Sequence, residues 1–561
     1  MTLIPPSRSL CASVLLFALA LAAPLEAQTL QASIRGVVRD ASRQPIAGAT
    51  LVLVREETGE MRTTASGPSG EFTIAQVAPG PHRLEIEAPG HARYAHRLTL
   101  AVAQAAWVDA TLQVVTAGED VTVTAPIVLL DVDSAALVTI VGERQVARLP
   151  LDGRNFLELA LLAPGAAPAA PGSATSIRGD FAFNVNGARE DANAYLLDGV
   201  FNVDPKLNGV AVRPPVDAIR EFEVLTSAYD ASFGRQAGAQ VNVVTKSGTN
   251  RFGGTLYGFL RNGALDARNH FAPPTEPAPD HERYQAGGSA GGPVVRNRVF
   301  VFADYEGTRL REGVTRVTTV PTPSERRGDF SRTAFARPIN PFTGQPFPGG
   351  VIPPEYLNPI GVAIAALYPE PNRDGPFGNA VSSPSLRDRH DQFDVRVDGV
   401  TAGASTLTAR YSFADRRLYE PFSGAGFAAV PGFGTHVPRR GQNLGVSFTR
   451  VLSSSLVNET RAAWTRVSGG SFHENQGTSL NRAVGLPELS ANPRDWGLSF
   501  ITVTGYSPLG DGYNEPQHST TNMLQALDTV TWSRGAHLVK TGVDVRALRQ
   551  DAYLDVQSRA Y

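Results

Sequence analysis

Cysteine is almost absent from this sequence: Cys11 is the only one among 561 residues. It lies before an apolar run that we expect to be removed with a secretion signal, so it is not the lipid-anchored cysteine that ends a lipoprotein signal. A mature chain without cysteine can form neither a disulfide nor a thiolate metal site. Both are excluded as sources of stability.

Charge is also scarce. Charged residues make up 19% of the chain, and 51 Lys and Arg against 53 Asp and Glu leave a formal net charge of −2. A nucleic-acid binder needs a surplus of basic residues to neutralise phosphates. We therefore expect no nucleic acid as a partner.

Long hydrophobic runs are missing as well. The longest, Val14–Ala23, is shorter than the roughly 20 residues that span a bilayer as a helix. Arg8 precedes it and Ala27 offers a small residue at a cleavage position, which is typical of a secretory signal peptide over residues 1–27. The alternative is a buried or membrane helix, and the short run disfavours a transmembrane one.

Glycine and proline are plentiful instead, with 54 and 41 residues. Together with 42% apolar residues, this composition favours many short strands and turns over long helices. The chain is also too long for one ordinary domain. We expect a mainly β protein of about two to four domains.

Short β-type runs alternate with turn signals through residues 33–114. The predicted strands are Ile34–Val38, Ala49–Arg55, Met61–Ala65, Glu71–Val77, His82–Glu87, Arg97–Val102 and Trp107–Leu112. This pattern predicts a small β-sandwich. The run GVVRDASRQPIAGATLVLV, with GPSGEFTIAQVAPGPHRLEIEAPG after it, resembles the carboxypeptidase regulatory-like domain with its transthyretin-like fold. The resemblance implies a non-catalytic module, similar to carbohydrate-binding sandwiches, that serves binding or assembly.

An extended segment comes after this domain and ends before Pro126, whose ring disfavours helix in the residue before it. Its residues are Glu119, Asp120, Val121, Thr122, Val123, Thr124 and Ala125. An exposed β-prone strand can join the sheet edge of a partner through main-chain hydrogen bonds. The segment is similar to the TonB box of TonB-dependent receptors, which implies that it binds the energy-transducing protein TonB. Since any linker can contain VTVTA, this interpretation depends on the neighbouring sequence.

Four sequence blocks on its C-terminal side supply that context, in one order: LPLDGRNFLELALLAPG, NGAREDANAYLLDG, EFEVLT and GRQAGAQVNVVTKSGTN. They resemble the plug domain of Oar-like TonB-dependent receptors, which implies an α+β plug at residues 126–250. Within the first block, Asp152 is expected to cap a helix that ends at Leu162. The buried face of that helix would hold Phe156, Leu159 and Ala160.

Several glycines of this region are expected at turns, where positive φ or a close backbone approach favours a residue without a Cβ atom. They are Gly187, Gly199, Gly234 and Gly238. None of them is proposed as a ligand contact.

Residues 251–561 change to longer strands in which apolar and polar residues alternate. Phe393, Val395 and Val397 alternate with Asp394, Arg396 and Asp398. Similar apolar sets are Leu407, Ala409, Tyr411 and Phe413; Leu444, Val446 and Phe448; and Val539, Thr541, Val543 and Val545. A lipid-facing barrel wall with a polar lumen gives this period of two, and so does a soluble sandwich.

Other features favour the membrane barrel over the soluble sandwich. They are the predicted signal peptide, the plug resemblance and interface-type aromatic residues such as Trp464 and Trp532. The blocks RFGGTLYGFLRNGALDARNHF, YQAGGSAGGPVVRNRVFVFADYEGTR and PTPSERRGDFS also resemble the early barrel of the same receptors.

The number of predicted wall strands differs from that of the barrels in this family. We count about nine candidate wall strands after Asn250, whereas such barrels have about 22. An open sheet edge in hydrocarbon leaves unpaired backbone groups that cost on the order of several kcal/mol each. We therefore expect this chain to be a fragment of a longer barrel that does not close by itself.

Signatures of an enzyme are weak. Residues Gly287–Gly291 fit G-x-S-x-G, but their flanks lead into a strand instead of the strand-to-helix turn of a nucleophile elbow. His82, His91 and His96 lack the cysteines or the H-E-x-x-H spacing of a zinc site. We expect no catalytic residue, no metal and no cofactor.

The remaining candidates are turns and loops. Asp131, Asp133 and Asp198 lack the spacing of a calcium loop and are interpreted as turn residues. The Pro- and Gly-rich stretches Pro321–Pro384 and Leu418–Arg440 are expected to face outward and to capture a solute.

These inferences predict a TonB-dependent receptor in the outer membrane, with its N-terminal domain in the periplasm. It would transport an unidentified solute, with carbohydrate as one candidate, using energy from TonB because no Walker-type phosphate loop is present. The rival is a structural or adhesive surface protein that binds a polymer without transport. The intact TonB-box-like segment and plug blocks favour transport. The expected partners are TonB, outer-membrane lipid, and the solute or polymer.

Overall fold

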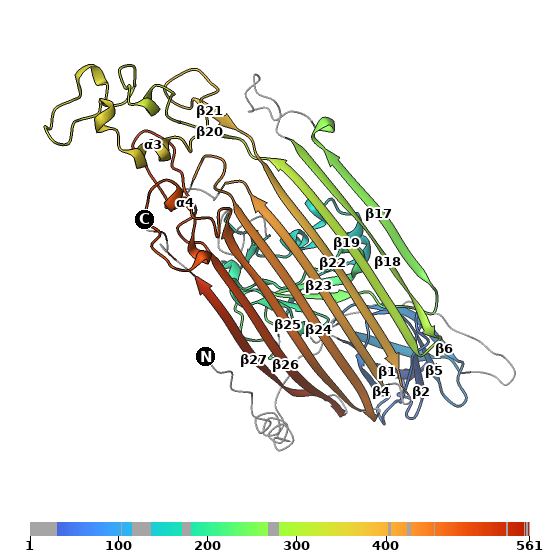
Figure 1. Ribbon diagram of the computed structural model, residues 1–561. Coiled ribbons are helices and arrows are strands. Elements are labelled where there is room, and N and C mark those ends of the chain that lie inside the picture. The colour runs from blue at the N-terminus through green and yellow to red at the C-terminus, as the bar shows by residue number, and fades with distance from the viewer. Residues whose placement is uncertain are drawn as a thin grey trace.

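The computed structural model describes residues 31–554 except 103, 115–135, 171–180, 230, 267–279, 402–404, 423–427, 454 and 535–536, together with residues 556 and 559. The predicted signal peptide (1–27), the segment Glu119–Ala125, and Asp131 and Asp133 lie outside the described residues. A sandwich, a mixed sheet and a large antiparallel sheet succeed one another along the chain (Figure 1). None of the helices in the described part is both long enough and apolar enough to span a membrane.

All seven strands predicted for the sandwich are confirmed. They are β1 (Ala32–Asp40), β2 (Thr50–Arg55), β3 (Met61–Ala65), β4 (Glu71–Val77), β5 (Gly80–Glu87), β6 (Tyr94–Leu100) and β7 (Ala105–Leu112). They form two sheets, ordered β4-β1-β7 and β3-β2-β5-β6. Ile34 from the first sheet and Leu51 and Leu84 from the second are fully buried in one apolar cluster. The alternating strands therefore bury one face each, as facing sheets require.

The mixed sheet has five strands in the order β12-β11-β16-β15-β8. Its strands are β8 (Leu137–Gly142), β11 (Ala194–Leu197), β12 (Val200–Phe201), β15 (Ile219–Ser227) and β16 (Gln240–Thr245). Most of β15 is buried without alternation, because other parts of the chain cover both faces of this strand. Phe222 and Val224 of β15 pack with Phe156 and Phe183 in the core.

Short elements surround this sheet. The helices are α2 (Glu143–Arg148), η1 (Asp152–Arg154), η2 (Phe156–Leu162), η4 (Glu190–Ala192) and η5 (Val216–Ala218). Two-stranded ribbons are formed by β9 (Ala166–Pro168) with β10 (Phe183–Val185), and by β13 (Val203–Asp204) with β14 (Gly209–Val210).

The helix predicted from Asp152 to Leu162 is wrong in its start and type. Gly153 and Arg154 have left-handed φ values of 62° and 57°, so the chain breaks into two 3₁₀ segments. Asn155, and not Asp152, caps the second segment by accepting a hydrogen bond from the Leu157 N–H. The predicted buried face is confirmed, because Phe156, Leu159 and Ala160 are all in the core.

The predicted turn glycines differ in outcome. Gly187 and Gly199 have φ values of 75° and 78°, as expected. A Cβ atom at Gly238 would lie 2.5 Å from the Asn193 Oδ1 atom, so this glycine permits a close approach. The prediction is wrong for Gly234, which has no positive φ and no neighbour within 4 Å of a Cβ atom.

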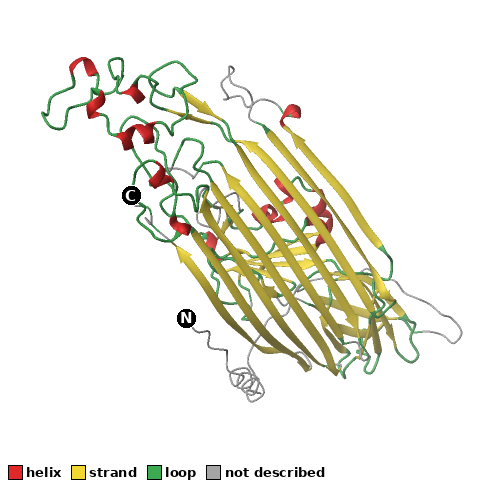
Figure 2. Ribbon diagram, viewed as in Figure 1, coloured by secondary structure: helices red, strands yellow, loops and turns green. Residues whose placement is uncertain are grey.

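The large sheet has nine strands in sequence order, as counted from the pattern of alternation (Figures 1 and 2). They are β17 (Gly253–Asn262), β18 (His281–Val295), β19 (Val299–Gly313), β22 (Ser385–Val400), β23 (Thr406–Glu420), β24 (Thr435–Ser453), β25 (Leu456–His473), β26 (Gln517–Arg534) and β27 (His537–Leu554). Every neighbouring pair is antiparallel. We call this sheet the wall; β17 and β27 are its two edges among the described residues.

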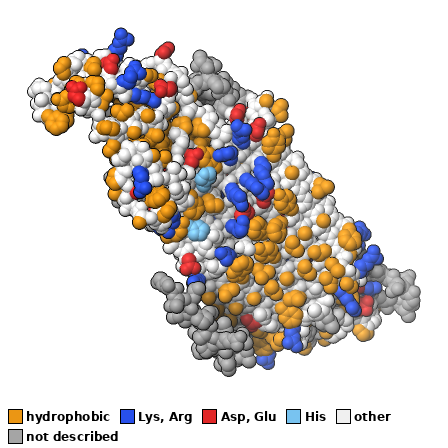
Figure 3. Space-filling view, in the orientation of Figure 1, with side chains coloured by type: hydrophobic (Ala, Val, Ile, Leu, Met, Phe, Trp, Pro, Cys, Tyr) orange, Lys and Arg blue, Asp and Glu red, His pale blue; other side chains and the backbone are white. Residues whose placement is uncertain are grey.

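The wall exposes apolar side chains and buries polar ones, which is the reverse of a soluble sandwich. Val395 and Val397 are 39% and 41% exposed, whereas Asp394 and Arg410 on the other face are each 2% exposed. The mixed sheet lies on the polar face (Figure 1), and hydrophobic side chains cover much of the lower outer face in Figure 3. This is the distribution of a lipid-facing wall with a polar interior, so the soluble alternative is excluded.

The two ends of the wall differ. Arg296–Arg298 joins β18 to β19, and the connections after β22, β24 and β26 are similarly short. At the other end, residues 314–384 carry β20 (Arg316–Thr318), η7 (Glu325–Arg327), η8 (Pro348–Gly350), η9 (Pro354–Tyr356), α3 (Pro359–Ala365) and β21 (Ala380–Ser382). The long connection between β25 and β26 holds α4 (Leu480–Ala483) and η11 (Pro493–Asp495), and between β17 and β18 the chain forms η6 (Gly263–Leu265).

These long connections pack into a cap. Its apolar cluster includes Val320, Tyr368, Val430 and Leu498, which come from three connections: β19 to β22, β23 to β24, and β25 to β26. The loop predicted over Leu418–Arg440 is wrong at both ends, because β23 continues to Glu420 and β24 begins at Thr435. Strands β23 and β24 of the wall therefore extend further toward the cap than the sequence predicted.

Candidate functional site

The hairpin of β11 and β12, which we call the Asp198 hairpin (residues 194–201), contacts the polar face of the wall. Asp198 and Gly199 form its two-residue turn, with φ values of 48° and 78°. An Asp-Gly pair suits this turn, because both residues need positive φ. The prediction of a turn at Asp198 is confirmed, and the turn places the Asp198 carboxylate against the wall.

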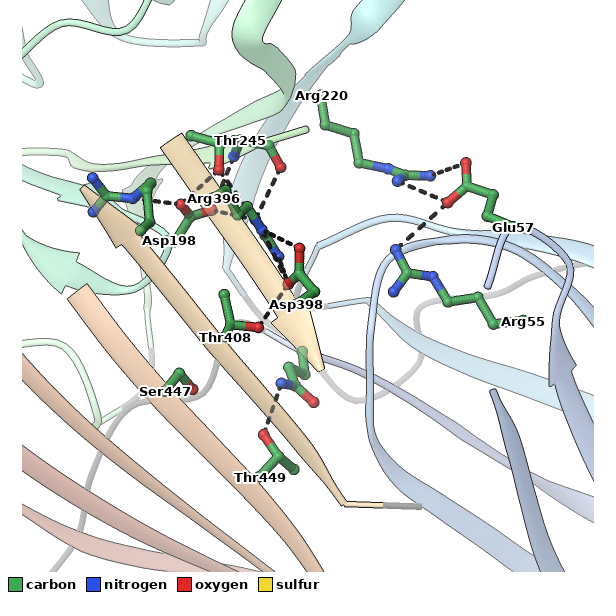
Figure 4. Close-up of polar contacts among 12 residues, drawn as sticks. Arg55, Glu57, Asp198, Arg220, Thr245, Arg396, Asp398, Thr408, Ser447 and Thr449 are labelled. Carbon is green, nitrogen blue, oxygen red and sulfur yellow. Dashed lines mark hydrogen bonds and ion pairs between the residues drawn. The ribbon is translucent and has the colours of Figure 1, made fainter. Parts of the chain in front are cut away.

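Two wall arginines meet this carboxylate (Figure 4). Arg410 Nε of β23 lies 2.8 Å from Asp198 Oδ2, and Arg396 Nη1 of β22 lies 3.2 Å from Oδ1. Thr245, at the end of β16, adds hydrogen bonds from its N–H (2.9 Å) and its hydroxyl (2.7 Å). Arg396 also pairs with Asp398 at 2.9 Å. One carboxylate of the mixed sheet thus joins two strands of the wall.

The wall binds the backbone of the hairpin as well. Carbonyl groups at Leu197, Gly199 and Phe201 accept hydrogen bonds from wall side chains. The donors are Arg410 to Leu197 (3.2 Å), Arg461 to Gly199 (3.4 Å), and Asn443 and Thr465 to Phe201 (3.2 and 3.0 Å). Gln525 Oε1 accepts from the Phe201 N–H at 2.9 Å, and the Arg546 guanidinium lies 4.2 Å from the centroid of the Phe201 ring. Together with the ion pair from Arg396 of β22, these contacts mean that strands β22 to β27 all contact this hairpin.

Asp198 and its arginine partners are largely buried, so their ion pairs determine the charge state of Asp198 and the stability of this contact. Burial alone would raise the pKa of Asp198, but the charges of Arg396 and Arg410 and the bonds from Thr245 hold that pKa below its ordinary value. Arg410 is 2% exposed, so removing its partner would leave a buried charge. Such a loss costs about 3–5 kcal/mol.

A second contact joins the sandwich to the mixed sheet. Glu57, in the turn between β2 and β3, accepts two hydrogen bonds from Arg220 of β15, each 2.9 Å long. Arg55 lies 3.5 Å from the same carboxylate, and the Asn250 N–H donates to the Glu57 carbonyl at 2.9 Å (Figure 4 shows the side chains of the ion pairs). We call this contact the Glu57 latch.

The pKa of Glu57 is lowered. Burial would raise it, but the hydrogen bonds and charge of Arg220, together with the charge of Arg55, outweigh burial. The carboxylate is therefore ionised and paired throughout the neutral pH range.

The sandwich also contacts the wall directly. Gln76 Nε2 donates to the Thr531 hydroxyl of β26 at 3.0 Å, and Gln31 Nε2 donates to the Thr449 hydroxyl of β24 at 3.2 Å. Both contacts lie near the ends of strands that carry the short connections. The sandwich therefore packs at this end of the wall (Figure 1).

The residues considered for chemistry do not come together. His82 is buried and its Nδ1 contacts the Gly80 carbonyl at 2.9 Å, whereas His91 lies nearer the surface and contacts the Pro89 carbonyl. Ser289 of the G-x-S-x-G run lies in the middle of β18, with its hydroxyl 2.8 Å from that of Thr255. In the part of the chain that the structure describes, no group of three His, Cys, Asp or Glu side chains is arranged to hold a metal ion.

Sequence reasoning missed the partners of Asp198. Arg396 and Arg410 stand at inward positions of two neighbouring strands, which the alternation had assigned to the polar face. A buried arginine on a lumen face needs an acidic partner, and this signal was available. The identity of the partner was not, because about 200 residues separate it from the arginines.

Two sequence families match the chain. The family described as "Outer membrane beta barrel domain" matches residues 244–560, and the "Carboxypeptidase regulatory-like domain" matches residues 33–113. The TonB-dependent transporter Oar of Myxococcus xanthus is 24% identical over 555 residues, which are 92% of this chain and 50% of that protein. The chain thus spans about half the length of this relative.

The solved structures that match part of the chain have low sequence identity to it. The outer membrane transporter YddB from Escherichia coli is 12% identical, with a TM-score of 0.47, over 74% of this chain and 48% of the other. A mutant of the ferric enterobactin receptor PfeA from Pseudomonas aeruginosa is 12% identical, with a TM-score of 0.42, over 75% and 50%.

Proposed function

Because the chain belongs to the outer-membrane β-barrel family, we propose that it acts as a TonB-dependent transporter in which the mixed sheet is the plug. The contacts of the Asp198 hairpin with six wall strands carry this proposal. A plug must block the lumen at rest and still be removable. Polar and ionic contacts satisfy both needs, because water can replace them when the plug moves.

The direction of the force follows from chain order. Residues Glu119–Ala125, proposed to bind TonB, lie between β7 of the sandwich and β8 of the plug. Among the described strands, β8 is at the edge of its sheet and pairs with β15 alone. Tension on this segment would therefore load β8 first, and β8 can leave without breaking another strand pair.

The orientation follows from the connections. Barrels of this kind have short periplasmic turns and long extracellular loops. We propose that the cap of long connections faces the outside and captures the solute, while the sandwich lies in the periplasm. The resemblance of the sandwich to carbohydrate-binding modules makes a carbohydrate one candidate for the solute.

Residues 12–561 contain no cysteine, so a single introduced cysteine in this part of the chain can report on plug movement once any cysteine elsewhere is replaced by serine. Val200 is 3% exposed and its side chain faces Gly445 of the wall, so V200C should be hidden from a water-soluble maleimide at rest. The complete protein is expressed in cells with TonB. We expect labelling when the cells are energised and a ligand-containing medium is supplied, and none in cells without TonB.

Matched variants make this test specific. M61C, at a position 61% exposed, should be labelled under all conditions. Replacing Val121–Ala125 by a Gly/Ser segment of equal length should abolish labelling at V200C and binding to the purified TonB C-terminal domain. If V200C is labelled to the same extent whether or not Val121–Ala125 is replaced, the proposed coupling role is wrong. If V200C is not labelled under any condition, the plug does not move, and the adhesive alternative is favoured.

A further inference from the structure

The outer face of the wall changes character along its strands. On β22, the outward residues Phe393, Val395 and Val397 are apolar, whereas the next outward residues toward the cap are Asp391, Arg389 and Arg387. The same change occurs on β19, β23, β24, β25 and β27. The exposed arginines beyond the change are Arg309, Arg311, Arg387, Arg389, Arg417, Arg440, Arg466 and Arg549. We call them the arginine belt; blue side chains above the orange band show part of it in Figure 3.

The belt is strongly positive although the whole chain is not. Its eight arginines share their face with four carboxylates, Glu282, Asp391, Asp415 and Asp551. The excess is four positive charges, in a chain whose net charge is −2. An excess of this kind on one face attracts anions to that face.

The aspartates hold the guanidinium groups in place without neutralising them. Asp391 lies 2.7 Å from Arg309 and 2.8 Å from Arg389, which are on neighbouring strands. Asp415 likewise lies 2.8 Å from Arg440 and 3.5 Å from Arg417. Each group of two arginines and one aspartate keeps one net positive charge.

Aromatic rings also fix the belt against the wall. Arg387 lies over the ring of Tyr419 at 4.7 Å, and Arg440 lies over Phe413 at 5.5 Å. The side chains of Arg389 and Arg417 remain 59% and 66% exposed. The guanidinium groups are thus held at the surface and can bind an external anion in bidentate fashion.

The position of the belt identifies its ligand. It lies between the apolar band, which contacts lipid tails, and the cap, so it is at the level of lipid headgroups. With the orientation proposed above, on which this inference rests, this is the outer leaflet, which in Gram-negative bacteria consists of lipopolysaccharide with phosphates on its lipid A. We propose that the arginine belt binds the lipid A phosphates of lipopolysaccharide around the barrel.

The test compares two sets of four arginines in the complete protein, purified from outer membranes in mild detergent. The belt variant is R309Q/R389Q/R417Q/R440Q. The control variant, R296Q/R298Q/R450Q/R534Q, makes the same change of charge at exposed positions near the short connections. Lipopolysaccharide bound per protein is measured by native mass spectrometry. We expect binding to be weaker by at least about tenfold in the belt variant and unchanged in the control.

Equal lipopolysaccharide in the belt variant and the unaltered protein would overturn the proposal, and so would a loss confined to the control. A second measurement covers the case in which the belt variant does not fold. The unaltered protein is placed in nanodiscs that contain either diphosphorylated or dephosphorylated lipid A. Retention of the phosphorylated lipid alone supports the belt, whereas equal retention contradicts it. Neither experiment involves TonB, so a failure here is distinct from a failure of the transport proposal.

Discussion

Asp198 shows what one residue contributes and how much of it the sequence reveals. Its Asp-Gly dipeptide predicts the turn, because few residues accept two successive positive φ values. Its ion pairs with Arg396 and Arg410 depend on how the mixed sheet packs against the wall. No local pattern contains that information.

Removal of the Asp198 charge should therefore loosen the plug locally. In D198N the buried Arg410 loses its carboxylate partner, and we expect the opening free energy of β11 and β12 to fall by about 3–5 kcal/mol. Hydrogen exchange of these strands in the complete protein measures this change. D191N, in an exposed pair with Arg189, should leave the exchange unchanged. Equal protection in D198N and the unaltered protein would contradict the structural role.

His82 gives the sandwich a dependence on pH. Burial lowers the pKa of this imidazole from 6.5 to about 4, against a smaller opposite effect of its bond to the Gly80 carbonyl. A lowered histidine pKa means that the unfolded state takes up a proton first, so stability is complete above about pH 6.5 and falls toward pH 4. We expect the sandwich to lose up to about 3 kcal/mol over this range.

Hydrogen exchange of β2 and β5 between pH 7 and pH 4, corrected for the intrinsic rates, measures that loss. An H82Q variant should show a flatter profile. An identical slope in both proteins would mean that another group causes the dependence.

Elements differ in how far the sequence predicts them. The seven sandwich strands and nine wall strands were predictable because alternation and turn residues are local signals. The helix at Asp152–Leu162 failed because Arg154 adopts positive φ and directs its guanidinium to Asp217, a contact that propensity does not register. The loop predicted over Leu418–Arg440 was too long. Pro438 and the two consecutive arginines after it are unusual in a strand, so the first residues of β24 were assigned to the loop.

The Glu57 latch is a contact between two elements, and its loss should separate them without unfolding either. In E57Q, Arg220 keeps a hydrogen-bond partner, but that partner is no longer charged. We expect faster hydrogen exchange in the β2–β3 turn and at the start of β15, together with unchanged exchange in the sandwich core. Because the pKa of Glu57 is lowered, the latch is intact at neutral pH and weakens only as pH falls through that lowered value, below the ordinary range near 4.3. Hydrogen exchange at the β2–β3 turn and β15 that is equally fast in both proteins would contradict the latch.

At the scale of the whole molecule, the order of domains was visible in the sequence through four blocks and two family resemblances, whereas their docking was not. Contacts such as Gln76 with Thr531 join residues 455 positions apart, and neither carries a motif. The inverted wall is the feature on which the rest depends. If its apolar face did not contact lipid, the plug, the orientation and the arginine belt would each lose their basis.

That orientation of faces can be measured with spin labels on the complete protein in liposomes, with any cysteine other than the labelled one replaced by serine; residues 12–561 contain none. Labels at Val395 and Val397 should collide with oxygen dissolved in the lipid and be shielded from a water-soluble nickel complex. Labels at Thr408 and Ser412, on the plug-facing side, should be poorly accessible to oxygen. Nickel accessibility at Val395 and Val397 equal to that of a soluble protein would contradict the account.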